Sequence, residues 1–205
     1  MSKKPVIVFE GIEGSGKTFH LNNVSNYLKK KNIPFIKIRE PGGNNNSEKI
    51  RKIILNSKSK LDPLTDLLLY LAARNENVSK IIRKNYKKKL ILIDRFVDST
   101  LAYQHYGMNL SLDLINHINK IILKSIKIDF TFLNIVNPKN LKERLSKRKN
   151  LNRYDKFNIN FYKSVQHGYL KIYKKKPSKY MLVNSNLSIK TNKDLIIKKL
   201  EKIIK

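Results

Sequence analysis

The chain of 205 residues contains no cysteine. It therefore forms neither disulfide bonds nor thiolate metal sites. It also lacks any run of eighteen apolar residues, so the sequence predicts no membrane-spanning helix. No signal peptide is evident, because residues 1–5 lead directly into the first expected strand. We therefore expect a soluble, cytoplasmic protein that forms a single domain over residues 1–205.

Acidic residues are scarce, since 15 Asp and Glu stand against 44 Lys and Arg, and the formal charge is +29 at pH 7. One interpretation is a basic nucleic-acid-binding protein. However, the lysines are spread along the whole chain, and no basic patch is interleaved with aromatic residues. We favour a general compositional preference for Lys, Asn and Ile, and expect no specific nucleic-acid partner. The positive field would still attract small anionic substrates.

Arginine is also scarce, because 36 of the 44 basic residues are Lys. A guanidinium group grips phosphate or carboxylate through two hydrogen bonds, which an ammonium group cannot do. In this background each arginine is a candidate for such a contact. The eight positions are Arg39, Arg51, Arg74, Arg83, Arg95, Arg144, Arg148 and Arg153.

A glycine-rich segment near the N-terminus has the pattern G-x-x-x-x-G-K-[ST], which holds nucleotide phosphates. Its residues are Gly11, Ile12, Glu13, Gly14, Ser15, Gly16, Lys17 and Thr18. An apolar strand is expected before it and a helix after it, as the motif requires. Backbone N–H groups and the helix N-terminus would bind phosphate. Lys17 would reach the β- and γ-phosphates, and the Thr18 hydroxyl would bind Mg²⁺.

Five short apolar runs alternate with segments of helical spacing. This alternation predicts an α/β fold with a parallel sheet. The expected strands are 6–9, 33–38, 90–93, 129–133 and 180–183. The expected helices end near residues 31 and 56, start at residues 62–63 and 138, span about 158–174, and start near residue 192.

Charged residues follow two of these strands, and ligands bind at the carboxyl ends of strands in open α/β sheets. Arg39 and Glu40 stand in a turn with Pro-Gly-Gly, where a surface ion pair is the alternative interpretation. Asp94 directly follows the strand 90–93, a position suited to a magnesium ion or its waters. Arg95 beside it could hold the phosphate of a second substrate.

Further candidates lie on predicted helices and in a polar segment. Tyr70 and Arg74 are one helical turn apart, although a tyrosine on such an apolar helix is commonly part of the core. The segment 99–104 carries several groups able to hydrogen-bond a base or sugar. The cationic segment of about residues 147–157 predicts a flexible lid over phosphates, with a solvated loop as the alternative.

Taken in order, these motifs resemble bacterial thymidylate kinases, within the P-loop nucleoside monophosphate kinases. The matching stretches are residues 9–18, 39–43, 70–74, 94–96, 99–104 and the lid around Arg153. The resemblance implies a three-layer P-loop kinase fold with a five-stranded parallel sheet and helices on both faces. It also implies Mg²⁺-dependent transfer of the ATP γ-phosphate to thymidine 5′-monophosphate (dTMP), for dTTP synthesis, by a homodimer.

The resemblance further implies roles for individual residues in binding dTMP. Glu13 would approach the deoxyribose 3′-hydroxyl, and Tyr103 would lie under the sugar. Tyr70, where the family usually has Phe, would stack on thymine. The other implied contacts are from Arg39 at the strand end, Arg74 to the base, Arg95 to the acceptor phosphate, and Ser99, Thr100 and Gln104 along the base and sugar.

This phosphate loop contains no arginine. In family members of that type the lid supplies the catalytic arginine, so Arg148 and Arg153 are the candidates, beside Lys17 and Arg95. Residues 135–138 are Ile-Val-Asn-Pro where the family often has Asp-Val-x-Pro, so any role for that carboxylate is lost, and Asp155 stands where Glu is common. For the dimer surface the sequence offers residues 64–71 and 115–122 and does not choose between them.

Three other functions are compatible with parts of the sequence. Another P-loop nucleoside or nucleotide kinase would share the phosphate loop. A GTP-binding switch would need Asn-Lys-x-Asp, and the nearest string, at residues 192–195, has its Asp one place early. A nucleic-acid-binding protein would use the +29 charge instead.

Overall fold

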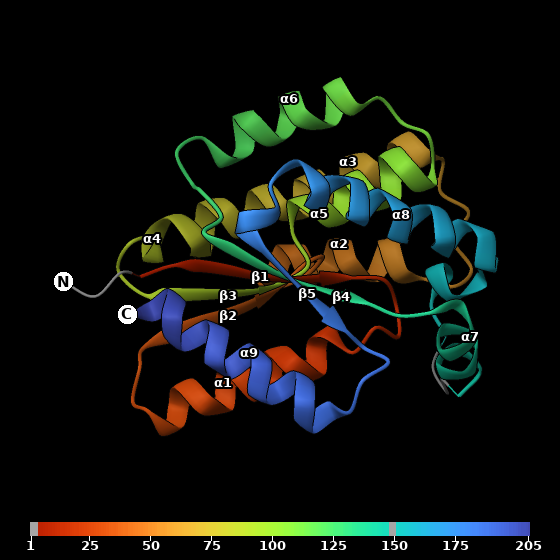
Figure 1. Cartoon of the computed structure of the whole chain (residues 1–205). Helices are drawn as coiled ribbons and strands as arrows, with labels where there is room; N and C mark the ends of the chain where they lie inside the picture. Colours follow the sequence, from red (N-terminus) through yellow and green to blue (C-terminus); the bar gives the residue numbers. More distant parts are fainter. Residues whose placement is uncertain (1–3, 148–150) are drawn as a thin grey trace.

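A single parallel sheet of five strands forms the centre of the computed structural model, which describes residues 4–147 and 151–205 (Figure 1). The strand order is β2-β3-β1-β4-β5, and every neighbouring pair runs parallel. The strands are β1 (Val6–Gly11), β2 (Phe35–Arg39), β3 (Leu90–Asp94), β4 (Phe130–Ile135) and β5 (Tyr180–Asn184). The five-stranded parallel sheet expected from the sequence is confirmed.

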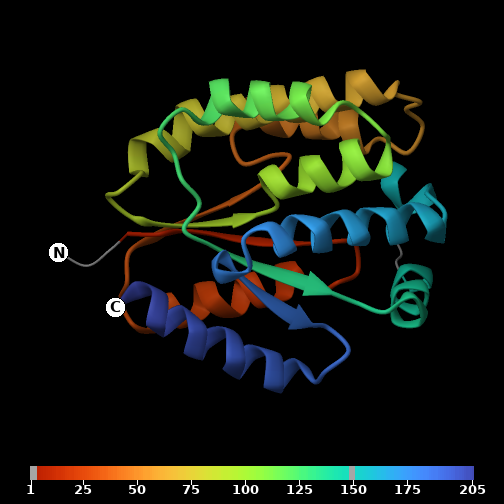
Figure 2. The same cartoon turned by 45° about the horizontal axis from the view of Figure 1, so that its top comes forward.

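Helices cover both faces of the sheet, so the architecture has three layers (Figures 1 and 2). Helices α1 and α9 lie together on one face, and the remaining long helices apart from α7 lie on the other. The α-helices are α1 (Lys17–Lys30), α2 (Asn45–Leu55), α3 (Pro63–Asn77), α4 (Arg83–Asn85), α5 (Val97–Thr100), α6 (Leu112–Leu123), α7 (Pro138–Ser146), α8 (Ile159–Lys175) and α9 (Ile189–Ile204).

Four further helical segments in the described part of the chain have a different winding. Two are π-helical, η1 (Val78–Ile82) and η2 (Leu101–Gly107), and two are 3₁₀ turns, η3 (Arg153–Lys156) and η4 (Pro177–Lys179). Segment η2 continues directly from α5. A π-helical stretch widens the helix and is frequent at functional sites. None of the helices that the structure describes is long and apolar enough to cross a bilayer.

The strands form where the sequence has continuous apolar runs, because both faces of the sheet are covered. All six residues of β1 are buried, and so are the first four of β3. In the register of the sheet Phe9 lies opposite Asp94 on one side and Phe132 on the other. The polar residue that ends β3 therefore lies beside the end of β1, where the glycine-rich loop begins.

Polar caps fix the helix starts much as the sequence predicts. The Asp62 carboxylate caps α3, with Pro63 at its first position, and the Asn137 amide caps α7, which starts with Pro138. One start differs from expectation, because α9, expected from near residue 192, is capped by Ser188 and begins at Ile189. Helix α2 is capped by Asn44.

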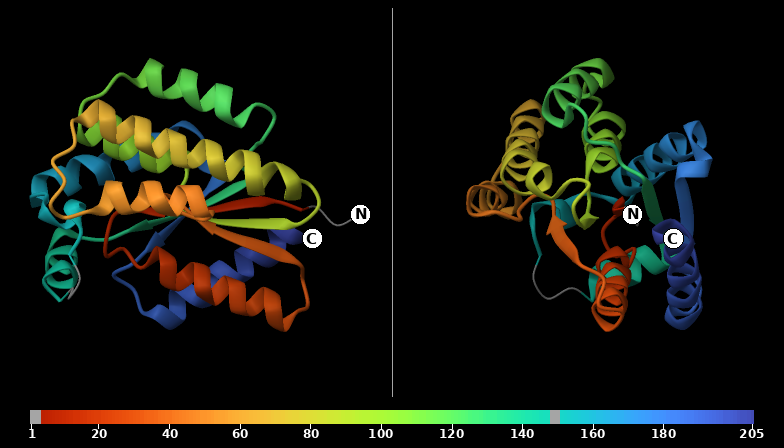
Figure 3. Two further views of the ribbon diagram at one scale, coloured as in Figure 1. Left: turned by 180° about the vertical axis from the view of Figure 1, so that it is seen from behind. Right: turned by 90° about the vertical axis from the view of Figure 1, so that its left-hand side faces the viewer.

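The carboxyl ends of the strands all point to one edge of the sheet, where α7 also lies (Figures 1 and 3). This edge brings together the loop after β1, the turn after β2 and the residues that end β3. The described residues of the expected lid of about 147–157 lie at the same edge. Residues 151–157 of it pack as a short loop and η3, whereas residues 148–150, including the candidate Arg148, fall outside the described part.

Candidate active site

The glycine-rich loop joins β1 to α1 and curls around an open space. Gly11, Gly14 and Gly16 all have positive φ angles, which L-residues with a side chain rarely adopt. A side chain at Gly11 would also clash with the carbonyl oxygen of Asn134 in β4. The Ser15 carbonyl oxygen accepts hydrogen bonds from Asn134 and from Ser185, so β4 and the segment after β5 hold the loop from behind.

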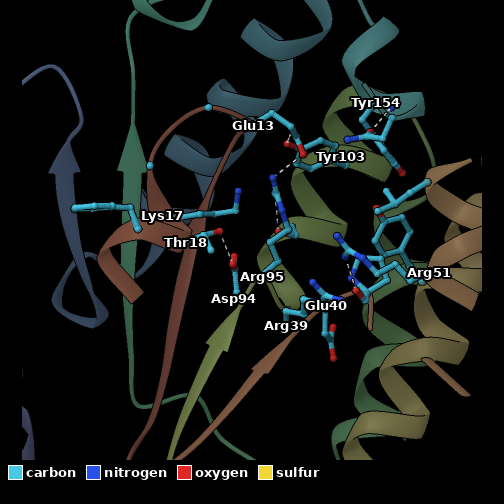
Figure 4. Close-up of a pocket in the computed structure, with 18 of the residues that line it drawn as sticks. Glu13, Lys17, Thr18, Arg39, Glu40, Arg51, Asp94, Arg95, Tyr103 and Tyr154 are labelled. Carbon is cyan, nitrogen blue, oxygen red and sulfur yellow. Dashed lines mark hydrogen bonds and ion pairs between the residues drawn. The ribbon is translucent and has the colours of Figure 1, made fainter. Parts of the chain in front are cut away.

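Lys17 lies at the start of α1, 8% exposed, and points into the cavity (Figure 4). Its Nζ lies 3.5 Å from the Ile12 carbonyl oxygen. Burial, together with the charge of Arg95, lowers the pKa of Lys17 to about 8. A phosphate group placed here would meet both an ammonium group and the N-terminus of α1.

Thr18 and Asp94 meet across the base of the cavity, as expected for a pair predicted to hold Mg²⁺. The Thr18 hydroxyl donates to Asp94 Oδ2 at 2.6 Å. The other carboxylate oxygen, Oδ1, is buried and has no partner among the described residues. Since Mg²⁺ takes oxygen ligands and keeps several waters, one hydroxyl and one carboxylate beside bound phosphates fit it. No cluster of three acidic or histidine side chains suited to a metal occurs in residues 4–147 and 151–205.

Arg95 occupies the centre of the site and has a strained backbone, with φ of 65°. Its side chain donates to the Gly11 carbonyl oxygen at 2.9 Å and forms an ion pair with Glu13 at 2.6 Å. The second oxygen of Glu13 accepts from the Tyr103 hydroxyl. Burial alone would raise the pKa of Glu13, but the charges of Arg95 and Lys17 outweigh it and lower the pKa.

Glu10 supports this centre from below, a role that the sequence analysis did not assign. It is fully buried and accepts hydrogen bonds from the Phe96 N–H at 2.8 Å and the Ser99 hydroxyl at 2.6 Å. The Tyr169 hydroxyl also donates to it, at 3.1 Å. These bonds fix the segment that carries Arg95 and Ser99. Burial raises the pKa of Glu10.

Arg39 and Glu40, adjacent in the sequence, have different partners. Arg39 lies in the cavity wall and pairs with Glu48 at 3.0 Å, with both side chains well exposed. Glu40 is buried and pairs with Arg74 at 2.9 Å. The alternative of a single surface ion pair between the two neighbours is therefore wrong.

Arg74 and Thr100 lie behind the cavity wall. Arg74 is 1% exposed and donates to Glu40, to the Asn119 side chain and to the Phe96 carbonyl oxygen. Its guanidinium is thus saturated by protein groups. Thr100 is equally buried, and its hydroxyl has no partner among the described residues. Neither Arg74 nor Thr100 is among the described residues that line the cavity. The structure therefore shows no direct contact between these two side chains and the space for a ligand.

The opposite end of the cavity is lined by Tyr70, Tyr103 and Gln104. Tyr70 comes from α3, and the other two come from the π-helical segment η2. The Tyr154 ring of the lid packs edge-on against both tyrosines, with centroids 6.2 Å from Tyr70 and 5.6 Å from Tyr103. We call this end of the cavity, which the rings of Tyr70, Tyr103 and Tyr154 line, the aromatic slot.

Arg153 of the lid and Arg144 of α7 lie at different ends of the cavity, whereas the resemblance implied a lid arginine at the transferred phosphate. Arg153 pairs with buried Asp66 and donates to the Ile54 carbonyl oxygen at 3.0 Å, so it lies at the aromatic end, away from the phosphate loop. Arg144, at the C-terminal part of α7, donates instead to the Gly14 carbonyl oxygen at 2.9 Å and lines the cavity. Of the described arginines in α7 and the lid, Arg144 is the one that contacts the phosphate loop.

One cavity of about 460 Å³ connects these groups. Figure 4 shows Lys17 and Thr18 at one side, Arg95 and Glu13 in the middle, and Arg51 and Tyr154 at the far side. Its wall also includes Arg51, which donates to the Pro41 carbonyl oxygen at 2.6 Å. The cavity can accommodate two anions, one at the loop and one near Arg95, with a flat apolar group between tyrosines.

Comparison with known proteins gives the family. The family model for thymidylate kinase matches residues 9–196. The chain belongs to the thymidylate kinase family. It is 38% identical to a thymidylate kinase of Mycoplasma capricolum over 89% of this chain and 88% of that one. It is 37% identical to one of Clostridium novyi, over 91% and 93% respectively.

A solved structure supports the same assignment. The thymidylate kinase of Ehrlichia chaffeensis superposes with a TM-score of 0.79 at 31% identity, covering 97% of this chain and 99% of that one. The resemblance inferred from the motifs is therefore confirmed at the level of the family and of the fold.

Four residues of this thymidylate kinase site were not assigned from the sequence: Glu10, Arg51, Asp66 and Arg144. The scarcity of arginine had marked Arg51 and Arg144 as candidates, and this signal could have identified both. Nothing comparable marks Glu10 or Asp66, because a single carboxylate in a strand or helix is common. Their roles follow only from their hydrogen-bond partners, which are at least 30 residues away in the sequence.

Proposed function

We propose that the protein transfers the γ-phosphate of ATP to dTMP, giving the diphosphate for dTTP synthesis. Membership of the thymidylate kinase family supports this reaction. The observation that carries it to these residues is that one cavity is lined by the phosphate loop at one end, the aromatic slot at the other and Arg95 between them.

For the nucleotide donor we propose that residues 11–18 hold the ATP phosphates. Lys17 faces the β- and γ-phosphates, and Thr18 with Asp94 binds Mg²⁺ or its waters. The ion, when bound, would neutralise phosphate charge and help align the transferred group. The unpartnered Asp94 oxygen and the neighbouring hydroxyl support this assignment.

For the acceptor we propose that thymine enters the slot beside Tyr70, with Gln104 at its polar edge. The deoxyribose then lies over Tyr103 and near Glu13, and the phosphate is near Arg95, Arg39 and Ser99. Stacking on an aromatic ring contributes about 1–3 kcal/mol per base. Arg74 supports the site from behind the cavity wall, where it orders Glu40 and Phe96.

Phosphoryl transfer needs little covalent chemistry from the protein. It requires two anions to be aligned and the charge on the migrating group to be neutralised. Arg95 serves both needs, because Glu13 and the Gly11 carbonyl oxygen hold its guanidinium between the two ends of the cavity. Burial would lower the pKa of Arg95, but the charge of Glu13 raises it well above the ordinary value, so the group stays cationic.

The activity test is a coupled ATP assay with a panel of nucleoside monophosphates. We expect ATP consumption to require dTMP. Deoxyuridine monophosphate (dUMP), which lacks the methyl group, should be a poorer substrate by roughly 10- to 200-fold. No turnover with dTMP and turnover with another monophosphate would overturn the proposal in favour of a different nucleotide kinase.

We further propose that the protein works as a homodimer in the cytoplasm, as members of this family usually do. Apolar side chains on the adjacent helices α3 and α6 support the dimer, since Leu68 is 50% and Ile121 is 57% exposed. Each of the two candidate stretches therefore carries an exposed apolar side chain. Light scattering should give twice the chain mass, and Leu68→Arg with Ile121→Arg should halve it. Leu195→Arg on α9 is the matched control, and a monomeric native protein would contradict the dimer.

A further inference from the structure

Asp66 lies at the closed end of the cavity, in the first turn of α3, and is fully buried. Three side chains from two other segments donate to its carboxylate. Gln104 Nε2 lies 2.9 Å from Oδ2, and the Tyr154 hydroxyl lies 2.7 Å from the same oxygen. Arg153 of the lid forms an ion pair with Oδ1. The carboxylate is thus the common partner of a cavity residue and of the lid.

This arrangement fixes which way the Gln104 amide points. A carboxylate that is ionised only accepts hydrogen bonds, so the nitrogen of the amide must face Asp66. The Tyr154 hydroxyl gives its own hydrogen to Asp66 and can accept the second hydrogen of Nε2, which lies 3.4 Å away. Both amide hydrogens are therefore used inside the protein.

The carbonyl oxygen of Gln104 remains for the ligand. Gln104 lines the cavity beside Tyr70 and Tyr103. No side chain or N–H group of the described residues donates to its Oε1. The cavity therefore offers a hydrogen-bond acceptor, and no amide donor, at the edge of the aromatic slot.

Arg153 forms an ion pair with Asp66, and its guanidinium also stacks over the Tyr154 ring, 4.9 Å from the centroid. The Arg153 side chain is largely buried, at 10% exposure, so the ion pair is weakly screened. The packing of lid residues Arg153 and Tyr154 and the orientation of the Gln104 amide thus depend on one carboxylate.

We propose that Asp66 is a positioning residue that selects the class of pyrimidine, by holding the Gln104 carbonyl toward the base edge. This inference rests on the proposed function. Uracil-type bases, including thymine, carry an N–H donor at ring position 3, which matches an acceptor. Cytosine has an acceptor at that position, so two lone pairs would face each other. The repulsive arrangement discriminates more strongly than a lost methyl contact does.

Asp66→Asn tests the proposal because it changes no shape. The three donors then compete for a single side-chain oxygen, and charged Arg153 has the strongest claim on it. The new amide nitrogen faces Gln104 and favours the flipped amide. We expect the ratio of kcat/KM for dTMP to kcat/KM for deoxycytidine monophosphate (dCMP) to fall by at least about tenfold, the effect of one mispaired buried hydrogen bond. The ratio of dTMP to dUMP should stay unchanged, since both bases carry the same donor.

Two further variants separate positioning from simple stability. Asp66→Glu keeps an acceptor-only group, and should preserve the selectivity for dTMP over dCMP even where KM rises. Asp194→Asn, on exposed α9, makes the same charge change away from the site and should alter neither ratio. If dTMP, dUMP and dCMP lose activity equally in Asp66→Asn, or if Asp66→Glu loses selectivity as Asp66→Asn does, Asp66 has no role in selection.

The design distinguishes this inference from the proposed function. Native protein without dTMP-dependent turnover would overturn the proposed function. If the native protein is active and Asp66→Asn has the same ratio of kcat/KM for dTMP to kcat/KM for dCMP, only the proposed role of Asp66 is overturned. Where Asp66→Asn folds poorly, calorimetric dissociation constants for the three monophosphates with Tyr154→Phe give the second measurement. Tyr154→Phe removes the acceptor of the second Gln104 amide hydrogen, so the preference for dTMP over dCMP in these dissociation constants should fall. An unchanged preference contradicts the proposal.

Discussion

At the scale of single residues, burial works against the charge that Lys17 needs. The ammonium group is removed from water and lies near Arg95, which together bring its pKa to about 8. Carboxylates at Asp94 and Glu13 offset part of this effect. Bound phosphates would restore the charge, because an anion favours the protonated form of the lysine.

This predicts an alkaline limit that depends on whether nucleotide is bound. The pKa of Lys17 is lowered from 10.5, so its charge is present below about pH 8 and is lost above it. Therefore kcat/KM for ATP, which reports the free enzyme, should fall as pH rises past 8, whereas kcat should hold to higher pH. Initial rates at varied ATP between pH 6.5 and 9.5 measure both. A kcat/KM that stays flat to pH 9.5 would contradict the depressed pKa.

The buried pair of Arg74 and Glu40 predicts a large effect on stability. Arg74→Met leaves Glu40 buried without its partner, and breaking such a pair costs about 3–5 kcal/mol. The double variant with Glu40→Gln should recover much of that loss, because it removes the unpaired charge. Urea unfolding followed by circular dichroism gives the free energies of unfolding. Equal loss in the single and double variants would show that the ion pair is not the cause.

At the scale of elements, lid residues 152–156 and helix α7 contact different ends of the cavity. The segment 152–156 binds the aromatic end, through Asp66, Ile54 and the ring of Tyr154. Helix α7 binds the loop end, where Arg144 links the Gly14 and Ser185 carbonyl oxygens. Arg148 lies between these anchors in the sequence, outside the described residues, and stays a prediction as the catalytic lid arginine.

Kinetics of three arginine variants should separate these roles. Arg153→Ala should raise KM for dTMP more than it lowers kcat, because its partners lie at the base end. Arg144→Ala should instead reduce kcat/KM for ATP, since the loop loses a support. Arg148→Ala should lower kcat by roughly 100- to 1,000-fold if it reaches the transferred phosphate. Lys147→Ala, an exposed lid cation paired with Glu143, is the control. A dominant kcat loss in Arg153→Ala would return the catalytic role to that residue.

At the scale of the whole molecule, the charge of +29 acts on substrates at a distance. Both expected substrates are anions, and such a field raises their local concentration. The Debye length shortens from about 10 Å at 0.1 M salt to about 3 Å at 1 M. Association should therefore weaken with salt while the chemistry inside the cavity changes little.

We accordingly expect kcat/KM for dTMP to fall between 0.05 and 0.5 M KCl, with kcat nearly constant. Fluorescence anisotropy with a 20-base-pair DNA duplex is the companion measurement, and only weak non-specific binding is expected, with Kd of roughly 1–100 µM. Tight and steeply salt-dependent DNA binding that persists in Lys17→Ala would instead favour the nucleic-acid interpretation of the charge.

Local patterns in the sequence determined the phosphate loop, four of the five strand starts to within one residue, and the starts of the helices at Pro63 and Pro138. These features depend on a few neighbouring residues, because glycine φ angles, apolar runs and polar caps act over short distances. The same patterns placed Lys17, Thr18, Asp94 and Arg95 at one edge of the sheet. Parallel strands align their carboxyl ends, so that conclusion needed no knowledge of side-chain contacts.

Only the tertiary structure decided which partner each charged side chain takes. The sequence leaves Arg74, Arg144 and Arg153 equally free to reach a ligand, because a long side chain can adopt many rotamers. Burial removes that freedom, since a buried guanidinium must find acceptors, and its acceptors come from distant segments. The pairing of Arg74 with Glu40 and of Arg153 with Asp66 is therefore a property of the packed molecule.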